Sequence, residues 1–344
     1  MIEHIETEFP GARGYLNTAS IGLPPRGAAD ELRAAIDVWQ RGSATAPGYD
    51  AYVDEARTLF AELAKVSPAT VAIGSQVSGL VGMVAAGLPS NATVVCPEGE
   101  FTSVIFPFMA RDDLNVTLVP LDELENSIGP STDLVAFSLV QSADGKVTDG
   151  QRIARAADRF GVKTLVDTTQ AAGWLPFDAS DFDVTVTGAY KWLASPRGTA
   201  FMTVRKASMD LPAPVHAGWY AGESPWDSIY GPPLRLAGNA RRFDLSPAWL
   251  AWVGTAAALR FVRDLGIATI HRHNVALANE LRSQLGLAAS DSAIVSLPLP
   301  ATTNHDRLGK LSTAERAGRL RVAFHFYNDR HDVDLLAAAL GASR

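Results

Sequence analysis

An acidic residue and a lysine stand at the ends of two apolar segments in the middle of the chain. Asp167 closes the segment 164–167, and Lys191 follows the segment 184–187 with Tyr190 and Trp192 on either side. Carboxyl ends of parallel strands border the crevice in which α/β sheets bind ligands. A lysine among aromatic residues at such a place is partly desolvated, which lowers the pKa of its ammonium group and favours its action as a nucleophile.

This pair of residue types suits pyridoxal phosphate chemistry. A pyridoxal phosphate enzyme needs a lysine amine that forms a Schiff base and an acidic residue that pairs with the pyridine nitrogen, which keeps the ring an electron sink. Lys191 and Asp167 offer these two groups. Spacing alone leaves a plainer interpretation open, in which Lys191 is a surface lysine and Asp167 caps a helix.

Two further segments could hold anions. Residues 72–88 read AIGSQVSGLVGMVAAGL, a short strand followed by polar residues and a helix of small residues. The amides of Val77 and Ser78 and the Ser78 hydroxyl could therefore bind phosphate at a helix N-terminus, although ordinary helix capping is an equal alternative. Arg321, in the segment LRVAFHFYN, could bind a carboxylate with its planar fork or lie solvated on an edge strand.

The surrounding elements alternate between strands and helices. Apolar runs predict strands at 71–74, 93–96, 116–119, 134–139, 164–167, 184–187 and 200–204, and helical patterns lie between them at 77–87, 101–110 and 151–160. Strands that are apolar throughout suit a sheet covered on both faces. The pattern predicts an α/β fold with a doubly wound, mainly parallel sheet.

Helical patterns also flank the predicted sheet, at 26–40 and 49–65 before it and at 249–265 and 268–285 after it. Strands at 292–297 and 319–326 and a helix at 331–340 complete the chain, and a turn-rich stretch covers 212–233. We expect residues 1–45 to form an N-terminal segment and part of a small domain, 46–245 a large domain, and 246–344 the rest of the small domain with a long connecting helix.

Composition narrows the classes of function. The 344 residues carry a net charge of −7, so a nucleic-acid surface is not expected. The lone cysteine, Cys96, excludes a disulfide within the chain, and the seven histidines show no metal-binding spacing, so no metal is expected. The acidic start of the sequence does not resemble a signal peptide, and no apolar stretch is long enough to span a membrane, so we expect a cytoplasmic protein.

Seven motifs together resemble the class V aminotransferase family of pyridoxal phosphate enzymes, which includes cysteine desulfurases, kynureninase-like hydrolases and isopenicillin-epimerase-like proteins. They are YLNTASIGLPP, EFTSVIFPF, SLVQSADGKVTD, LVDTTQAAGWLPFD, TGAYKWLASPRGTAF, RRFDLSP and LRVAFHFYN, in the family's order. The resemblance implies fold type I, with a seven-stranded mainly parallel sheet between helices in the large domain and a smaller α+β domain built from both termini. It also implies a homodimer with pyridoxal 5'-phosphate as cofactor and an amino acid as substrate.

The resemblance implies a role for each matching residue. Lys191 would form the Schiff base and move the α-proton, Asp167 would hold the pyridinium nitrogen, and Gln170 would bond the phenolic oxygen. Other cofactor contacts would come from Val77, Ser78, Phe101, Tyr190, Trp219 and Ser246, the last reaching the partner subunit's phosphate. Arg321, with Asn17 and Ser20 of the N-terminal segment, would bind the substrate. The sequence departs from the family at Gly188, where many relatives carry a phosphate-binding serine, and Tyr190 or Thr187 could compensate.

The resemblance leaves the reaction open. Cysteine desulfurases receive sulfur on a mobile cysteine before the carboxylate-binding arginine, and residues 296–319 contain no cysteine. A persulfide-forming desulfurase is therefore not expected, whereas lyases, epimerases and aminotransferases of the family do not need that thiol. Among these we expect an aminotransferase-like reaction. The alternatives are a C–S lyase or other β-eliminating enzyme, an epimerase, and a catalytically silent binding protein, which the presence of both Lys191 and Asp167 disfavours. A dehydrogenase is not expected, since the SQVSG segment lacks the glycine fingerprint of dinucleotide binding.

Overall fold

A large twisted sheet forms the centre of the protein, whose computed structural model describes residues 5–299 and 303–341. The described residues form seven strands in this sheet: β1 (Val71–Gly74), β2 (Thr93–Pro97), β3 (Asn115–Val119), β4 (Leu134–Ser138), β5 (Lys163–Asp167), β6 (Val184–Gly188) and β7 (Ala200–Val204). Their order is β1-β7-β6-β5-β4-β2-β3, and β7 runs antiparallel to both of its neighbours. The predicted seven-stranded, mainly parallel sheet is confirmed.

Helices cover both faces of this sheet, which explains its apolar strands. In β4, Leu134 and Ala136 pack into a core with α4 (Val77–Gly87) and α5 (Thr102–Met109). Val135 and Phe137 of the same strand pack into a second core with α3 (Asp50–Ala64) and α6 (Gly150–Phe160). Strand β3 differs from expectation, because it lies at the sheet edge and exposes three of its five residues.

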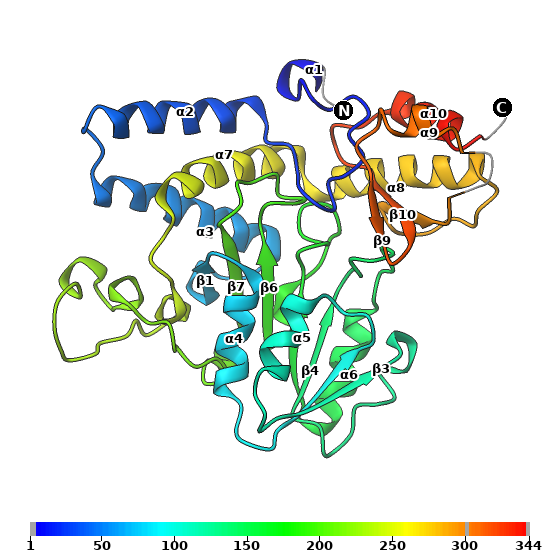
Figure 1. Ribbon diagram of the computed structural model, residues 1–344. Coiled ribbons are helices and arrows are strands. Elements are labelled where there is room, and N and C mark those ends of the chain that lie inside the picture. The colour runs from blue at the N-terminus through cyan, green and yellow to red at the C-terminus, as the bar shows by residue number, and fades with distance from the viewer. Residues whose placement is uncertain (1–4, 300–302, 342–344) are drawn as a thin grey trace.

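Three long helices pack together beside the sheet (Figure 1). They are α2 (Arg26–Gln40), α3 and α7 (Trp249–Leu265). Helix α7 ends at Gly266, whose φ of 76° suits a residue without a Cβ, and α8 (Ile267–Gln284) follows directly. This connection leads from the large sheet to the second part of the molecule.

A small antiparallel sheet forms the second part, with strand order β8-β10-β9. Its strands are β8 (Ile294–Leu297), β9 (Ala314–Arg316) and β10 (Arg319–Ala323), and α8, α9 (His305–Leu308) and α10 (Arg330–Ala339) lie beside it. Strand β10 is shorter than the predicted strand 319–326, because His325 N–H donates to the side chain of Asn328 in a turn rather than to a neighbouring strand. Strand β9 and the short helices α1 (Ile5–Glu8) and α9 were not predicted.

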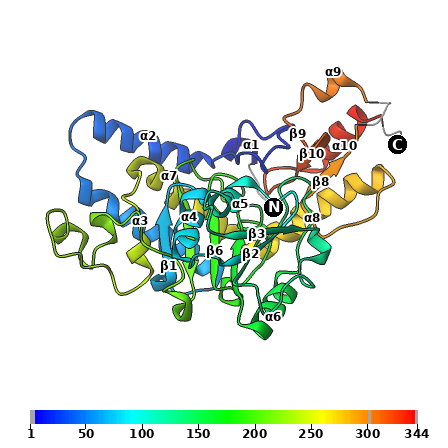
Figure 2. The ribbon, with the colours of Figure 1, turned by 60° about the horizontal axis from the view of Figure 1, so that its bottom comes forward.

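The N-terminal segment joins this small sheet, as Figure 2 shows from a second direction. Asn17 forms a parallel bridge with Ala323, and Tyr15 forms one with Ser312. Both ends of the chain therefore contribute to the small domain, as the sequence suggests, while the boundaries at residues 45 and 245 stay a proposal. Residues 300–302, within the stretch that lacks cysteine, lie outside the described residues.

The turn-rich stretch between β7 and α7 projects from the side of the molecule (Figures 1 and 2). It contains short 3-10 turns and exposes large apolar side chains, with Tyr230 91% and Leu234 77% exposed. None of the described helices has the length and apolar character needed to cross a membrane.

Candidate active site

A cavity of about 220 Å³ opens at the carboxyl ends of three parallel strands. The ends of β4, β5 and β6 supply Ser138, Asp167 and Gly188, and the loop before β7 supplies Thr199. The other lining residues come from the start of α4, the start of α5 and the segment after β6: Ser75, Gln76, Val77, Ser78, Phe101, Ser103, Ser142, Thr169, Gln170, Tyr190, Lys191, Arg197 and Gly198. The structure thus brings Lys191 and Asp167 to one cavity.

Lys191 is only 5% exposed. Burial lowers the pKa of its ammonium group to about 8, while Asp167 opposes this effect and the cationic Arg321, Arg316 and Arg197 add to it. The Lys191 Nζ lies 5.3 Å from the centre of the Phe101 ring. A lysine in this environment is partly neutral near pH 8, which is the form that attacks carbonyl groups.

Asp167 is buried at the end of β5, where the sheet register places it beside Val186 and Ser138. Its Oδ1 accepts a hydrogen bond of 2.7 Å from the N–H of Thr169. Burial raises the pKa of its carboxyl group to about 6, although the bonds from Thr169 and the charge of Lys191 favour the ionised form. A cationic partner in the cavity would stabilise the carboxylate.

The N-terminus of α4 faces the cavity without a side-chain cap. Gln76 precedes the helix in an extended conformation, and no side-chain oxygen accepts from the first helical amides. Val77 and Ser78 both line the cavity. Free amides at a helix start favour an anion such as phosphate.

Tyr190 lies beside Gly188, the position where many relatives carry a phosphate-binding serine. A Cβ at Gly188 would lie 3.2 Å from Cε1 of Tyr190, so a serine here would require the tyrosine ring to move slightly. Thr187 does not compensate from inside the cavity, because it is buried and its hydroxyl pairs with that of Thr168 at 2.6 Å. Arg197, which sequence reasoning missed, lies with its guanidinium 4.8 Å from the centre of the Tyr190 ring and lines the cavity.

Gln170 lies on the wall of the cavity with its side-chain amide fully engaged. Its Oε1 accepts from the indole of Trp192 at 2.7 Å. Its Nε2 donates to the carbonyl of Ala19 at 2.9 Å and to the Ser142 hydroxyl at 3.1 Å. A bond from Gln170 to a ligand would replace the contact with Ser142, the one partner that is free to rotate.

Arg321 reaches the same serine from β10. Its guanidinium donates to the carbonyl and hydroxyl of Ser142 and, at 2.8 Å, to the Ser20 hydroxyl. Burial lowers the pKa of Arg321 to about 10, and the charge of Arg316 adds to this effect. No carboxylate of the described residues forms an ion pair with this buried cation, so it is available to an anionic ligand.

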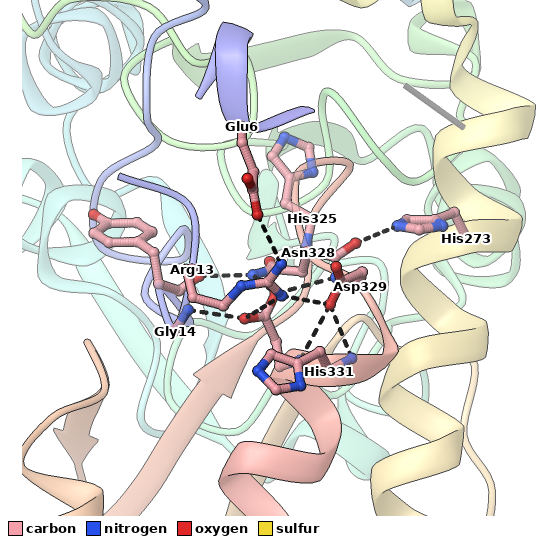
Figure 3. A network of polar contacts seen from close by, with 10 residues as sticks. Glu6, Arg13, Gly14, His273, His325, Asn328, Asp329 and His331 are labelled. Carbon is pink, nitrogen blue, oxygen red and sulfur yellow. Dashed lines mark hydrogen bonds and ion pairs between the residues drawn. The ribbon is translucent and has the colours of Figure 1, made fainter. Parts of the chain in front are cut away.

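A polar network holds the N-terminal segment against the C-terminal part (Figure 3). Arg13 pairs with Asp329 at 2.8 Å, and Gly14 N–H donates to the buried Asp332 at 2.8 Å. Asn328 donates to the carbonyl of Tyr15 at 3.0 Å. These bonds fix the segment just before Asn17 and Ser20, which were predicted to bind substrate.

The segment continues from this anchor to the lysine loop. Gly22 N–H donates to the carbonyl of Tyr190 at 2.9 Å. A Cβ at Gly22 would lie 2.0 Å from the carbonyl oxygen of Lys191, so only glycine allows this close approach. The Oδ1 of Asn17 is buried and has no hydrogen-bond partner in the described part of the chain, which suits a ligand contact.

Glu100 lies behind the residues that line the cavity, and sequence reasoning missed it as well. This carboxylate is 4% exposed and accepts hydrogen bonds from Ser138, Gln141 and the N–H of Phe101. It thereby joins the end of β4 to the start of α5 and to Phe101, whose ring is 42% exposed at the cavity rather than packed in the core. An acidic residue shortly after a predicted strand was the available sequence signal.

Five predicted residues do not line this cavity. Arg321, Asn17 and Ser20 lie beside it, on the side of Ser142 and Ala19, whereas Trp219 and Ser246 lie elsewhere in the chain. Trp219 packs against Trp226 and Tyr220 in the projecting stretch, at ring distances of 4.9 and 5.1 Å. Ser246 is exposed just before α7. Their proposed roles therefore depend on a second subunit.

The fold and the cavity together define a class of enzyme. A mainly parallel seven-stranded sheet carries a desolvated lysine and a buried aspartate at its carboxyl edge, beside an uncapped helix start. This donor set fits pyridoxal phosphate, with an amine for its aldehyde, a carboxylate for its ring nitrogen and free amides for its phosphate. The class is that of the pyridoxal phosphate enzymes of fold type I.

Comparison with known proteins identifies the family. The model of the class V aminotransferases matches residues 108–307, and the chain belongs to that family. It is 31% identical over 311 residues to the uncharacterized aminotransferase YcbU of Bacillus subtilis, covering 82% of each protein. It is 26% identical over 340 residues to the isopenicillin N epimerase of Streptomyces clavuligerus, covering 84% of this chain and 83% of the epimerase. The chain is therefore an enzyme that uses pyridoxal 5'-phosphate.

A solved structure shares the complete fold. The cystine C–S lyase C-DES, in complex with its reaction product cysteine persulfide, superposes with a TM-score of 0.87 at 22% identity. The match covers 96% of this chain and 98% of the lyase. The likeness extends the fold assignment to both domains.

Proposed function

We propose that this enzyme transfers the amino group of an amino acid, with Lys191 as its reactive amine. One observation carries the proposal: the buried Lys191 shares a cavity with Asp167, and Arg321 borders that cavity through Ser142. A base, a carboxylate for the cofactor ring and a cation for a substrate carboxylate are the three groups that such a reaction requires.

The residues of this chain divide the cofactor among them. Bound pyridoxal phosphate supplies an aldehyde that accepts amino groups and a ring that draws electrons from them. In our proposal Asp167 pairs with the ring nitrogen, and the α4 amides, the Ser78 hydroxyl and Arg197 hold the phosphate. Gln170 bonds the phenolic oxygen, while Phe101 and Tyr190 border the ring.

Lys191 and Arg321 act on the substrate. With a pKa lowered to about 8, part of the Lys191 side chain is unprotonated near neutral pH, so this amine is free to take a proton from the substrate Cα and to return it elsewhere. Arg321 binds the α-carboxylate with its planar fork, which orients the substrate. Asn17 and Ser20, held by the N-terminal segment, close this end of the site and exclude water.

We favour transfer of the amino group because it needs a single group that moves protons at Cα, and Lys191 supplies one. The titratable residues that line the cavity in the described chain are Asp167, Tyr190, Lys191 and Arg197. Asp167 and Arg197 are assigned to the cofactor, and Phe101 carries no titratable group. β-Elimination or epimerisation is the second candidate, because the Tyr190 phenol beside Lys191 could serve as the additional proton donor.

We also propose that two copies of the chain assemble. The exposed apolar side chains of the projecting stretch, such as Tyr230 and Leu234, lie on a surface that a second subunit could cover. Trp219 and Ser246 lie on or near the same stretch and would then reach the partner's phosphate site. Light scattering of the enzyme would measure the mass directly, and a monomer would refute this assignment.

Amino donors and product analysis test the proposed reaction. The loaded enzyme should absorb at about 420 nm, and an amino donor should convert the cofactor to its amine form with release of one keto acid. A lyase would instead release ammonia and pyruvate without an acceptor, and an epimerase would invert Cα. Lys191→Ala is the matched inactive control. Failure of every amino donor to form the amine cofactor would contradict the proposal.

A further inference from the structure

Two arginines meet at one hydroxyl group beside the candidate site. Arg321 Nη2 donates to Ser20 Oγ at 2.8 Å, and Arg316 Nη2 donates to the same oxygen at 3.2 Å. Arg316 ends β9 and Arg321 lies on β10, and these strands form one hairpin. The two guanidinium groups therefore converge on Ser20 from neighbouring strands.

The hairpin holds Arg316 in a defined place. Its turn consists of Ala317 and Gly318, with φ values of 49° and 71°, a tight connection between β9 and β10. The register pairs Arg316 with Arg319. Arg319 nevertheless binds elsewhere, donating to the hydroxyl and carbonyl of Ser296 on β8. Only Arg316 of this pair reaches Ser20.

Neither converging arginine has a carboxylate partner among the described residues. Arg316 otherwise donates to the backbone carbonyl of Glu315 at 2.7 Å, and Arg321 donates to Ser142. Arg316 is exposed and Arg321 is buried, so an anion that enters between them would meet one solvated and one desolvated cation. The Ser20 hydroxyl that both arginines share connects Arg316 to Arg321, which contacts the cavity-lining Ser142. The charge of Arg316 also lowers the pKa of Lys191.

We propose that Arg316 binds an acidic group on the substrate side chain, so that the preferred substrates are amino acids with a second carboxylate. This proposal rests on the proposed function, in which Arg321 takes the α-carboxylate and leaves Arg316 for another anion. Ser20 Oγ accepts from both arginines, and its own proton is free to bond one of the carboxylates. The serine oxygen already lies where both cations point.

Binding of carboxylates that lack an amino group tests the proposal without turnover. Calorimetry on the enzyme loaded with pyridoxal phosphate would compare glutarate and succinate with butyrate. We expect at least one dicarboxylate to bind about tenfold more tightly than butyrate, the effect of one added charge-assisted contact. Equal affinity for butyrate and both dicarboxylates would overturn the proposal.

Variants test whether Arg316 acts through a specific contact with the ligand or only through its positive charge. Arg316→Gln should abolish the preference for dicarboxylates and leave butyrate binding unchanged, whereas Arg319→Gln, three residues away on the same hairpin, should keep the preference. Arg321→Gln should weaken all three ligands. An equal loss in the Arg316 and Arg319 variants would contradict a specific contact. The two proposals can fail separately. If the loaded enzyme prefers dicarboxylates over butyrate but forms no amine cofactor with any amino donor, the proposed amino transfer is refuted and the role of Arg316 stands.

Discussion

The indole N–H of Trp192 donates to Oε1 of Gln170 at 2.7 Å, and this bond joins the two loops that carry the proposed cofactor contacts. Trp192 directly follows Lys191, and Gln170 lies three residues after Asp167. Both side chains are buried. The bond fixes which end of the Gln170 amide faces the cavity, since the Nε2 end is then left to donate.

Removing this donor should impair both stability and cofactor binding. Trp192→Phe keeps an aromatic ring but leaves Oε1 of Gln170 buried without a partner, which should lower the free energy of unfolding by about 1–3 kcal/mol. It should also lower the affinity for pyridoxal phosphate. Urea titration and cofactor absorbance measure the two effects.

Trp174→Phe is the matched control, because its indole donates to the backbone carbonyl of Gln170 at 2.6 Å rather than to the side chain. We expect a similar loss of stability without the loss of cofactor affinity. Equal cofactor affinity in the two variants would show that the Trp192 bond does not orient the amide.

Replacing Asp167 should separate stability from cofactor binding. Burial raises its pKa to about 6, so the charged carboxylate opposes folding of the cofactor-free protein above that pH. The protonated carboxyl of Asp167 avoids this cost, so its favourable effect on stability is complete below the unfolded pKa of about 4 and is lost as the pH rises through the folded pKa of about 6. Asp167→Asn should therefore stabilise the cofactor-free protein at pH 8 by about 1–3 kcal/mol, and by less at pH 5.

The same variant should bind pyridoxal phosphate at least about tenfold more weakly, because the ring nitrogen loses its anionic partner. Asp112→Asn, an exposed position, should change neither property. A loss of stability of the same size at pH 5 and pH 8 would contradict the electrostatic account of Asp167.

Arg197 should contribute to binding of the cofactor phosphate and not to binding of the pyridine ring. Arg197→Gln should lower the affinity for pyridoxal phosphate about tenfold, the effect of one lost charge-assisted contact. The affinity for pyridoxal, which lacks the phosphate, should not change. Arg155→Gln on the exposed face of α6 is the control. If both ligands weaken equally, Arg197 acts on the shape of the cavity through Tyr190 and not on the phosphate.

A buried ion pair holds β1, the strand that leads to the proposed phosphate site at the start of α4. Arg57 of α3 pairs with Asp244 at 2.7 Å, and Asp244 also accepts from the N–H of Ile73 in β1 at 2.8 Å. Asp244→Ala leaves the buried Arg57 without its anion and should cost about 3–5 kcal/mol of unfolding free energy. Asp30→Ala, which breaks the exposed pair with Arg33, should cost under about 0.5 kcal/mol. Urea titrations that give similar losses for the two variants would be inconsistent with this role.

The sequence predicted the large sheet well because its strands are short, apolar and buried on both faces. The same strands placed Asp167 at the end of β5 and Lys191 shortly after β6, but this spacing also suited a surface lysine and a helix cap, and the family resemblance supplied their proposed roles. The edge strand β3 was assigned the wrong environment, because an apolar run does not reveal which strand lies at the edge. Strand β10 was drawn too long, because Phe324 and Phe326 are buried in a turn as deeply as in a strand.

The residues that sequence reasoning missed depend on contacts between distant segments. Glu100 gains its meaning from Ser138 and Gln141 on another strand end, and Arg197 from the Tyr190 ring. Arg316 meets Ser20 across almost the whole chain, and its strand, β9, was not predicted. Such pairings follow from the tertiary fold and leave no local pattern of spacing.

Covalent labelling of the lysine tests the central claim most directly. The protein would be loaded with pyridoxal phosphate, reduced with borohydride, digested and mapped by mass spectrometry. We predict one pyridoxyl phosphate group per chain, on Lys191, with a rate of attachment that rises with pH through about 8 as the amine loses its proton. Label on any other lysine, or an unlabelled Lys191, would contradict the account.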